Sequence, residues 1–507
     1  MKICFVVFGP LEQGPSGPAS NVASTRYRAL LPANYLARQG HEVQVISVPE
    51  SGWTAERINA VAADVVVFTK SFHPSNEELA RSLKARGARV VGDVCDDNFD
   101  DPEHGPHVRR LLAACDAIVA STTVIARRVR QALGRDCVVV SDPVEGPRAP
   151  ARYRPAFPAV KVLWFGANQS LNTLFQGADE LMRLAARMPV YLGVVCSPVP
   201  ETQAFAENVH AASKGRVRVS IVPWSREVVW GALAETDVVW IPTLPDARHQ
   251  AKSPNRLLES LWAGRMVAAG ALPSYEPFAP FTPVGRGLDV AVLEALANPS
   301  AAEARVGEAQ RSIARDHSVF AIGRQWASAI GVAGLGAVRL NLGCGDKILP
   351  GYVNVDVVES RAGMAPDVVC DLHSLTPFPD GFADEILSVH VIEHFWRWEA
   401  EDIVREWLRV LKPGGRMVIE CPNIEHACRR LMESPESAAR EDRSGQETMW
   451  VFYGDPRWKD PLMVHRWGYT PRTLAELLAQ AGLREVRQEP AQFKLREPRD
   501  MRVVGVK

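Results

Sequence analysis

The feature that most constrains the fold is a short apolar run that leads directly into a glycine turn at residues 338–346, Val-Arg-Leu-Asn-Leu-Gly-Cys-Gly-Asp. Such a run is typical of a buried strand, and Gly-x-Gly lets the backbone that follows approach a ligand closely. Apolar runs that lead into glycine also begin near residues 3 and 160. Because apolar runs and helical stretches alternate after each start, the chain is predicted to be an α/β protein with parallel sheets.

The length of 507 residues exceeds what one hydrophobic core usually serves, since domains commonly have about 100–200 residues. The predicted domains are residues 1–150, 151–335 and 336–507. A proline-rich linker at 148–158 and a glycine-rich hinge at 331–337 mark the boundaries. The formal net charge of -1 argues against a general nucleic-acid-binding protein, which usually has a strongly basic face.

Cysteines and apolar runs bear on the location of the protein. The nine cysteines include no Cys-x-x-Cys pair, and their odd number favours reduced thiols in a cytoplasm. The N-terminal apolar run lacks the charged lead and the cleavage site of a signal peptide. No run approaches the ~20 apolar residues that span a bilayer, so no transmembrane segment is expected. Peripheral contact with a membrane is left open.

Two segments of the first domain could bind a ligand. A glycine-rich loop at 9–18 leads to Ser-Thr-Arg-Tyr-Arg at 24–28, where amides and arginines could hold a phosphorylated group; solvated arginines are the alternative. The acidic segment 93–101 lacks the glycine and glutamate positions of a calcium loop, and no metal site is predicted. Strands are expected in this domain at 3–8, 42–48, 64–69, 89–93, 117–120 and 137–140, with the first helix at 24–39.

The second domain contains an informative helix at residues 252–267. Pro254 suits its first turn, Ser253 its N-cap and Gly264 its end. A carboxylate at Glu259 can accept both hydroxyls of a ribose, while the N-terminal amides and Lys252 face a diphosphate. A solvated glutamate on an amphipathic helix is the alternative. Strands are expected at 160–166, 190–195, 217–222, 238–241 and 266–269.

With these motifs, residues 1–335 resemble a GT-B-fold glycosyltransferase of the "glycosyl transferases group 1" kind, which has two Rossmann-like domains. The resemblance implies a metal-independent transfer of sugar from a nucleotide-sugar donor to an acceptor. The chain departs from the family at Ala251, where a second glutamate is common, and His73 is the candidate for the family's first-domain histidine. The donor-binding residues that it implies are Gly166, Lys252, Ser253, Asn255 and Glu259.

In the third domain, the residues after the glycine turn argue against nicotinamide binding. Ile348 stands where that fingerprint has a third small residue, and Asp356 lies only 11 residues past Gly345, against ~20 in the fingerprint. Strands are expected at 338–342, up to residue 356, at 368–372, from 383 and at 416–421. A helix is expected at 401–411, a tight turn at 412–415, and a helix and final strand within 469–486.

This ensemble resembles class I S-adenosylmethionine-dependent methyltransferases, most clearly over residues 338–425, with a Rossmann-like domain. The resemblance implies that S-adenosylmethionine is the cofactor. Its methionine part would lie at Gly343 and Gly345, its ribose at Asp356, and its adenine between Asp371 and Leu372.

Methylation of a hydroxyl needs a proton acceptor, and histidine serves this role most often. His394 and His465 are the candidates for catalysis, whereas a structural role is favoured for His390 and Glu393. The aromatic-rich segment 448–467 is either an acceptor lid, whose rings cover a sugar, or a packed excursion.

The sequence therefore predicts a bifunctional enzyme that transfers a sugar and methylates an oxygen of a glycan or glycosylated product. The acceptor is expected to be a glycan or glycolipid, and family resemblance suggests surface polysaccharide assembly. One alternative is an active methyltransferase fused to a glycosyltransferase-like domain that only binds its ligand, which Ala251 favours. The other is a scaffold in which both sites are silent.

Overall fold

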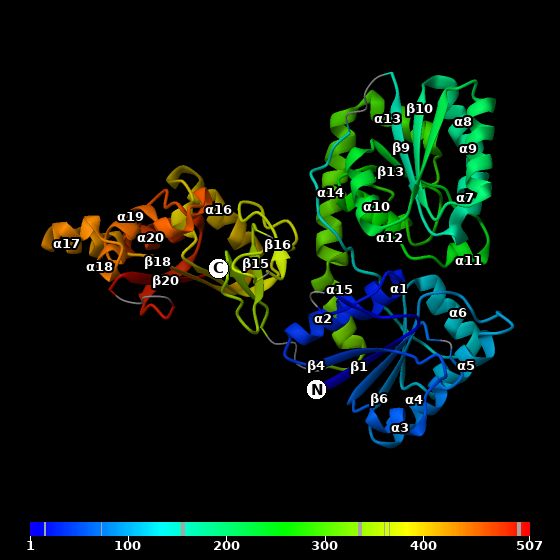
Figure 1. The fold of residues 1–507 in the computed structure, drawn as a ribbon, viewed down its shortest axis with the longest axis horizontal. Helices are drawn as coiled ribbons and strands as arrows, with labels where there is room; N and C mark the ends of the chain where they lie inside the picture. Colours follow the sequence, from blue (N-terminus) through cyan, green and yellow to red (C-terminus); the bar gives the residue numbers. More distant parts are fainter. Residues whose placement is uncertain are drawn as a thin grey trace. The chain divides into compact units, whose positions relative to one another are not determined.

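The computed structural model describes residues 1–507 except 15–16, 72, 154–157, 333–336, 359, 365 and 494–497. It forms two compact units, Met1–Ala333 and Gly334–Lys507 (Figure 1). Parts of the predicted linker at 148–158 and of the predicted hinge at 331–337 lie outside the described residues.

The first sheet of unit 1 is entirely parallel, with the strand order β4-β1-β5-β6-β7-β8. Its central strands are continuous apolar runs, because helices bury both faces of the sheet. The strands are β1 (Lys2–Val7), β4 (Glu42–Ser47), β5 (Val65–Thr69), β6 (Arg89–Val94), β7 (Ala117–Ala120) and β8 (Val138–Val139). The glycine-rich loop after β1 contains an antiparallel pair, β2 (Glu12–Gly14) and β3 (Gly17–Ala19).

The helices around this sheet include α3 (Ala55–Ala60), α4 (Asn76–Ala85), α5 (Gly105–Ala114) and α6 (Thr123–Leu133). Thr122 caps α6 through its side chain, and Gly134 ends it in the left-handed conformation. The predicted helix at 24–39 is interrupted. It consists of α1 (Ala23–Thr25), a π-helical turn η1 (Arg26–Leu30) and α2 (Leu31–Arg38). Such π turns often lie at functional sites.

The second sheet of unit 1 is also parallel, with the order β11-β10-β9-β12-β13. Its strands are β9 (Val160–Phe165), β10 (Val190–Cys196), β11 (Val217–Pro223), β12 (Val238–Ile241) and β13 (Met266–Ala269). Helices α7 (Leu171–Gln176), α8 (Ala178–Arg187), α9 (Pro200–Ala212), α10 (Arg226–Glu235), α11 (Ala247–Gln250), α12 (Asn255–Trp262) and α13 (Leu288–Ala297) belong to this half.

Two closing helices, α14 (Pro299–His317) and α15 (Val319–Ala329), join the halves of unit 1. Figure 1 shows α15 beside α2 of the first half. The indole of Trp326 meets the Phe5 ring edge-on, with centroids 6.0 Å apart. Gly323 is required here because a Cβ atom would lie 2.3 Å from the Tyr35 ring.

Unit 2 contains a seven-stranded sheet with the order β16-β15-β14-β17-β18-β20-β19. The first five strands in this order are parallel, while β20 is antiparallel to both β18 and β19. The strands are β14 (Arg339–Leu342), β15 (Val353–Asp356), β16 (Val368–Val369), β17 (Ala383–Val389), β18 (Leu411–Pro422), β19 (Arg484–Glu489) and β20 (Asp500–Val506). The chain reverses its direction of growth at β14, so a topological switch point lies between β14 and β17.

The helices of unit 2 are α16 (Arg397–Val410), α17 (Ile424–Glu433), α18 (Arg443–Gln446), α19 (Met449–Tyr453) and α20 (Pro471–Ala481). The expected turn at 412–415 lies inside β18, where the pairing with β17 is irregular. The predicted α/β fold class, with two Rossmann-like sheets followed by a third, is confirmed. Among the residues that the structure describes, we find no helix with the length and apolarity needed to cross a bilayer.

Candidate functional site

The glycine turn of unit 2 lies at the carboxyl end of β14. Gly343 and Gly345 have φ angles of 68° and 55°, which disfavour residues with a side chain. A Cβ atom at position 343 would lie 2.4 Å from Val391, whereas at position 345 it would meet only Arg361, at 3.7 Å. The turn therefore packs tightly against the β17 side and leaves its backbone open at Gly345, as a cradle for a bound cofactor requires.

Asp356 fixes this turn from the end of the neighbouring strand β15. Its Oδ2 accepts a hydrogen bond of 2.7 Å from the amide of Gly345, and its Oδ1 accepts one of 3.2 Å from Val358. The residue is 7% exposed. Each carboxylate oxygen has a second lone pair, so Asp356 can still accept the hydroxyls of a ribose.

Asp371 and Leu372 follow β16, the next strand along this edge. Asp371 Oδ1 accepts hydrogen bonds from the backbone and the ring of His373, at 2.9 and 2.8 Å. Partial burial raises the pKa of Asp371, but these bonds outweigh it and hold the pKa below its ordinary value. Leu372 is buried, and its carbonyl accepts a bond of 2.9 Å from Trp407. The predicted cofactor residues thus lie at the carboxyl ends of three adjacent strands.

A polar network continues beyond β17. His390 adopts a left-handed conformation, with φ of 57°. Its Nδ1 lies 3.5 Å from Glu393 and its Nε2 lies 3.2 Å from Asp500. Asp500 is paired with Arg499. His390 therefore bridges two buried carboxylates on different elements.

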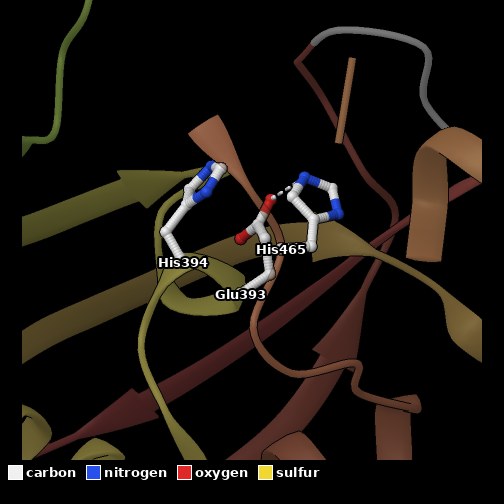
Figure 2. Close-up of side chains that lie close together, drawn as sticks. All are labelled: Glu393, His394 and His465. Atoms are coloured by element: carbon white, nitrogen blue, oxygen red, sulfur yellow. Dashed lines mark ion pairs between the residues drawn. The ribbon is translucent and has the colours of Figure 1, made fainter. Parts of the chain in front are cut away.

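The two histidines predicted to be catalytic come together with Glu393. Figure 2 shows all three side chains converging from the turn after β17 and from the segment that carries His465. His465 Nε2 lies 3.9 Å from Glu393 Oε1, and the rings of His394 and His465 are 5.0 Å apart at 76°. The three residues offer ligand atoms that lie within 4.8 Å of one another.

The aromatic side chains of segment 448–467 differ in their exposure to solvent. Trp450 is buried, whereas Tyr453, Trp458 and Trp467 are 65%, 41% and 46% exposed. Outside the segment, Trp396 stacks on Trp398, with ring centroids 4.8 Å apart. Exposed rings therefore flank the segment that carries His465.

In unit 1, Glu259 does not project from a solvated helix face. Its carboxylate accepts a hydrogen bond from the hydroxyl of Tyr27, which lies in the π turn η1 of the other half. Burial raises the pKa of Glu259 to about 7, and the bond from Tyr27 opposes that rise. The predicted ribose-binding carboxylate is thus held against the first half of the unit.

Two other predicted donor-binding residues, Lys252 and Asn255, also contact side chains of the first half. Lys252 Nζ lies 2.7 Å from Asp96, and Asn255 Nδ2 donates a bond of 2.9 Å to Asp142. Ser253 was predicted to cap the helix, but α12 begins at Asn255, and Pro254 occupies the N-cap position without a side-chain bond. That capping prediction is wrong because the proline, rather than the serine, precedes the first helical residue.

Gly166 lies directly after β9, close to the start of α12. A Cβ atom there would lie 3.2 Å from the Trp164 ring and 3.4 Å from Arg256 Nη1. Arg256 also donates a bond of 3.2 Å to the carbonyl of Phe165. The structure therefore places an arginine that the sequence interpretation did not single out beside the predicted donor loop.

The arginines at 24–28 are buried and paired with carboxylates. Arg28 is fully buried between Asp93 and Asp142, at 2.6 and 3.0 Å. Arg26 pairs with Glu145 at 2.8 Å. The solvated alternative is therefore wrong, because Asp93 of β6 and the carboxylates of Asp142 and Glu145, which follow β8, pair with these arginines inside the fold.

The acidic segment 93–101 is also paired with cations. Asp96 contacts both Lys70 and Lys252, at 2.6 and 2.7 Å, and Asp97 contacts Arg128 at 2.6 Å. These partners explain the acidic run without a metal ion.

Ala251 and His73 are the two positions at which the resemblance to glycosyltransferases raised a question about catalysis of sugar transfer. Ala251 is 2% exposed and packs with apolar residues of the first half, and its carbonyl accepts a bond of 3.2 Å from Thr122. His73 Nδ1 lies 2.7 Å from Ser75 Oγ, and a Cβ atom at Gly52 would lie 2.7 Å from its ring. Position 251 is thus a packing position in this chain, and His73 is held by its local loop.

Comparison with known proteins gives one family match. Residues 340–419 match the family described as "Methyltransferase domain". The chain matches no curated protein. The methyltransferase resemblance predicted from the motifs of the third domain is thereby confirmed.

Solved structures with similarity to the chain include glycosyltransferases and a methyltransferase. HepE (Alr3699) of Anabaena in complex with UDP-glucose is 13% identical, covers 65% of this chain and 99% of its own, and has a TM-score of 0.46. A glycosyltransferase from Rickettsia africae is 14% identical, with coverages of 64% and 97% and a TM-score of 0.48. A SAM-dependent methyltransferase from Archaeoglobus fulgidus is 20% identical, with coverages of 34% and 87% and a TM-score of 0.25.

Proposed function

We propose that the chain is a bifunctional enzyme, in which unit 1 transfers a sugar from a nucleotide-sugar donor and unit 2 methylates an oxygen of a glycan or glycolipid. The observation that carries the proposal is the edge formed by the Gly343 turn, Asp356 and Asp371, within the part of the chain that matches a methyltransferase domain. All nine cysteines are outside disulfide bonds, which supports a cytoplasmic setting.

In unit 2, the proposed cofactor is S-adenosylmethionine, which supplies an electrophilic methyl group when bound. The open backbone at Gly345 would receive its methionine part, and Asp356 would accept hydrogen bonds from its ribose. Asp371 and Leu372 would lie on either side of its adenine. The carboxylate of Asp356 is already oriented by two backbone bonds, so little reorganisation accompanies binding.

The acceptor of unit 2 is proposed to bind beside the residues beyond β17. Exposed indoles such as Trp398, which is 74% exposed, offer apolar faces of the kind that cover a sugar ring. The cluster of Glu393, His394 and His465 would then hold the acceptor hydroxyl and assist the loss of its proton. Holding nucleophile and methyl group in line provides much of the acceleration for such a displacement.

In unit 1, the donor is proposed to bind at α12, through Glu259, Lys252, Ser253, Asn255 and Gly166. Each of three of these side chains contacts a residue of the first half: Glu259 contacts Tyr27, Lys252 contacts Asp96 and Asn255 contacts Asp142. A nucleotide sugar that used these three side chains would have to displace those partners. Donor binding is therefore coupled to separation of the two halves of unit 1.

The alternative function of unit 1 is a module that binds a nucleotide or glycan without turnover. Two observations favour it: Ala251 is buried at the position where the resembling family often has a glutamate, and Glu259 is held by Tyr27. In this alternative only unit 2 is an enzyme.

The experiment that separates the two functions is a transfer assay on the full chain with a panel of nucleotide sugars. Bifunctional action predicts donor hydrolysis or transfer that is lost in Glu259→Ala and kept in Asp356→Asn. Donor binding without turnover, abolished by the same Glu259 variant, would instead establish the binding module. Donor turnover that persists in Glu259→Ala would refute the assignment of the site to α12.

A further inference from the structure

Three side chains from two distant segments converge beyond the carboxyl end of β17. Glu393 and His394 belong to the turn η4 (Ile392–His394), and His465 is contributed by a segment 71 residues further along. Figure 2 shows their functional ends facing one another. One nitrogen or oxygen atom of each lies within 4.8 Å of the other two.

Both histidines have the hydrogen-bonding pattern that orients a metal ligand. His394 Nδ1 lies 3.1 Å from the carbonyl oxygen of Val464, and His465 Nδ1 lies 2.8 Å from that of Val451. A carbonyl can only accept, so each Nδ1 carries the proton and donates. In the neutral imidazole the lone pair is then on Nε2, and in His465 this atom faces Glu393 at 3.9 Å. Metal-binding histidines commonly donate their other ring nitrogen to a carbonyl in this way.

The charge at the centre of the cluster also favours a cation. Glu393 is 1% exposed, and its neighbour Asp500, across His390, is 1% exposed. Buried carboxylates in proteins are either paired or bound to metal ions. Arg499 pairs with Asp500, and the Glu393 carboxylate lies 3.5 Å from the imidazole of His390 and 3.9 Å from that of His465.

We propose that Glu393, His394 and His465 bind a divalent first-row transition-metal ion such as Zn²⁺. Two imidazoles and one carboxylate form a donor set that such ions use when a further coordination position stays open. Donor atoms about 2.1 Å from a tetrahedral ion lie about 3.4 Å apart, so the cluster needs only a contraction by side-chain rotation. The ion would also fasten the segment of His465 to the turn after β17.

The location of the proposed metal site suggests a role for the ion in methyl transfer. Val391, two residues before Glu393, contacts the Gly343 turn, which places the site next to the proposed cofactor cradle. An acceptor hydroxyl at the open coordination position would be polarised there. This use rests on the proposed methyl transfer; in it both histidines act as ligands, and the proton of the hydroxyl would pass to solvent water. Binding of the ion does not depend on that function.

The test measures metal binding by the full chain, purified without a histidine tag. After dialysis against Zn²⁺ and removal of excess, elemental analysis is expected to find one equivalent. Substitution with Co²⁺ is expected to give the visible absorption of a nitrogen- and oxygen-ligated ion. Glu393→Gln, His394→Gln and His465→Gln are each expected to bind at least about 10-fold more weakly. The matched control is His426→Gln, which alters a histidine of the same unit outside the cluster.

Calorimetry with S-adenosylmethionine accompanies each variant, since retained binding shows that the fold is intact. Less than one-tenth equivalent of metal in the wild type would overturn the proposal, as would unchanged binding in the three cluster variants. If metal binds but S-adenosylmethionine does not, the metal site stands and the proposed methyl transfer fails. Equal loss of metal in His426→Gln would also overturn the assignment to this cluster.

Discussion

Replacing Glu259 with glutamine tests whether the buried carboxylate of Glu259 destabilises unit 1 when it is ionised. Burial raises its pKa from 4.5 to about 7. A carboxyl whose pKa is raised by folding contributes stability below the unfolded pKa, and the contribution is lost as pH rises through the folded pKa. The window therefore runs from pH 4.5 to about 7. The free energy of unfolding that is lost across this pH range is ~3 kcal/mol. We reduce this value to ~2 kcal/mol because Glu259 keeps some solvent contact.

The assay is differential scanning calorimetry of the full chain at pH 5 and pH 8. Unit 1, Met1–Ala333, has an unfolding entropy of ~0.7 kcal/mol per kelvin, so ~2 kcal/mol corresponds to about 3 °C. Glutamine keeps an acceptor for the Tyr27 hydroxyl and has no titrating proton. The melting temperature of Glu259→Gln relative to the wild type is therefore expected to rise by about 3 °C between pH 5 and pH 8. A difference that stays constant with pH would refute this reasoning.

The remaining predictions concern packing, a buried ion pair and the acceptor surface. Gly343→Ala is expected to abolish S-adenosylmethionine binding in calorimetry, because its Cβ would lie 2.4 Å from Val391 in a left-handed backbone; unchanged affinity would contradict the cradle. Arg28→Met leaves Asp93 buried without its cation and is expected to destabilise unit 1 by about 3–5 kcal/mol in thermal denaturation; a loss below 1 kcal/mol would count against this account. Trp398→Ala is expected to leave the melting temperature unchanged, since the indole is 74% exposed, while raising the KM for a glycan acceptor; an unchanged KM would exclude this ring from the acceptor site.

The sheets could be predicted from the sequence because parallel strands buried on both faces are continuous apolar runs. For β7, β12 and β13 the predicted and observed bounds are identical. The strand β20 was missed. Its apolar pattern is interrupted by Asp500 and Arg502, which are buried because His390 and Glu420, far away in the sequence, neutralise them. Local patterns contain no information about such partners.

For the same reason, the sequence predicted the site residues that are close together in the chain and missed the contacts between distant segments. The Gly343 turn and Asp356 were found because a strand, a turn and the next strand follow directly in the chain. The contact between Tyr27 and Glu259 spans 232 residues and depends on how two sheets pack. Tyr27 lay within the segment singled out for its arginines, but nothing local indicated that its hydroxyl would face Glu259.

The measurement that tests the central claim most directly is calorimetric titration of the full chain with S-adenosylmethionine. The wild type is expected to bind one equivalent. In Asp356→Asn, the amide can keep the bond from Gly345 but loses the carboxylate for the ribose, so the affinity is expected to fall at least about 10-fold, the effect of ~1.4 kcal/mol. No binding by the wild type, or equal binding by the variant, would contradict the assignment of unit 2 as a methyltransferase whose cofactor lies at this edge.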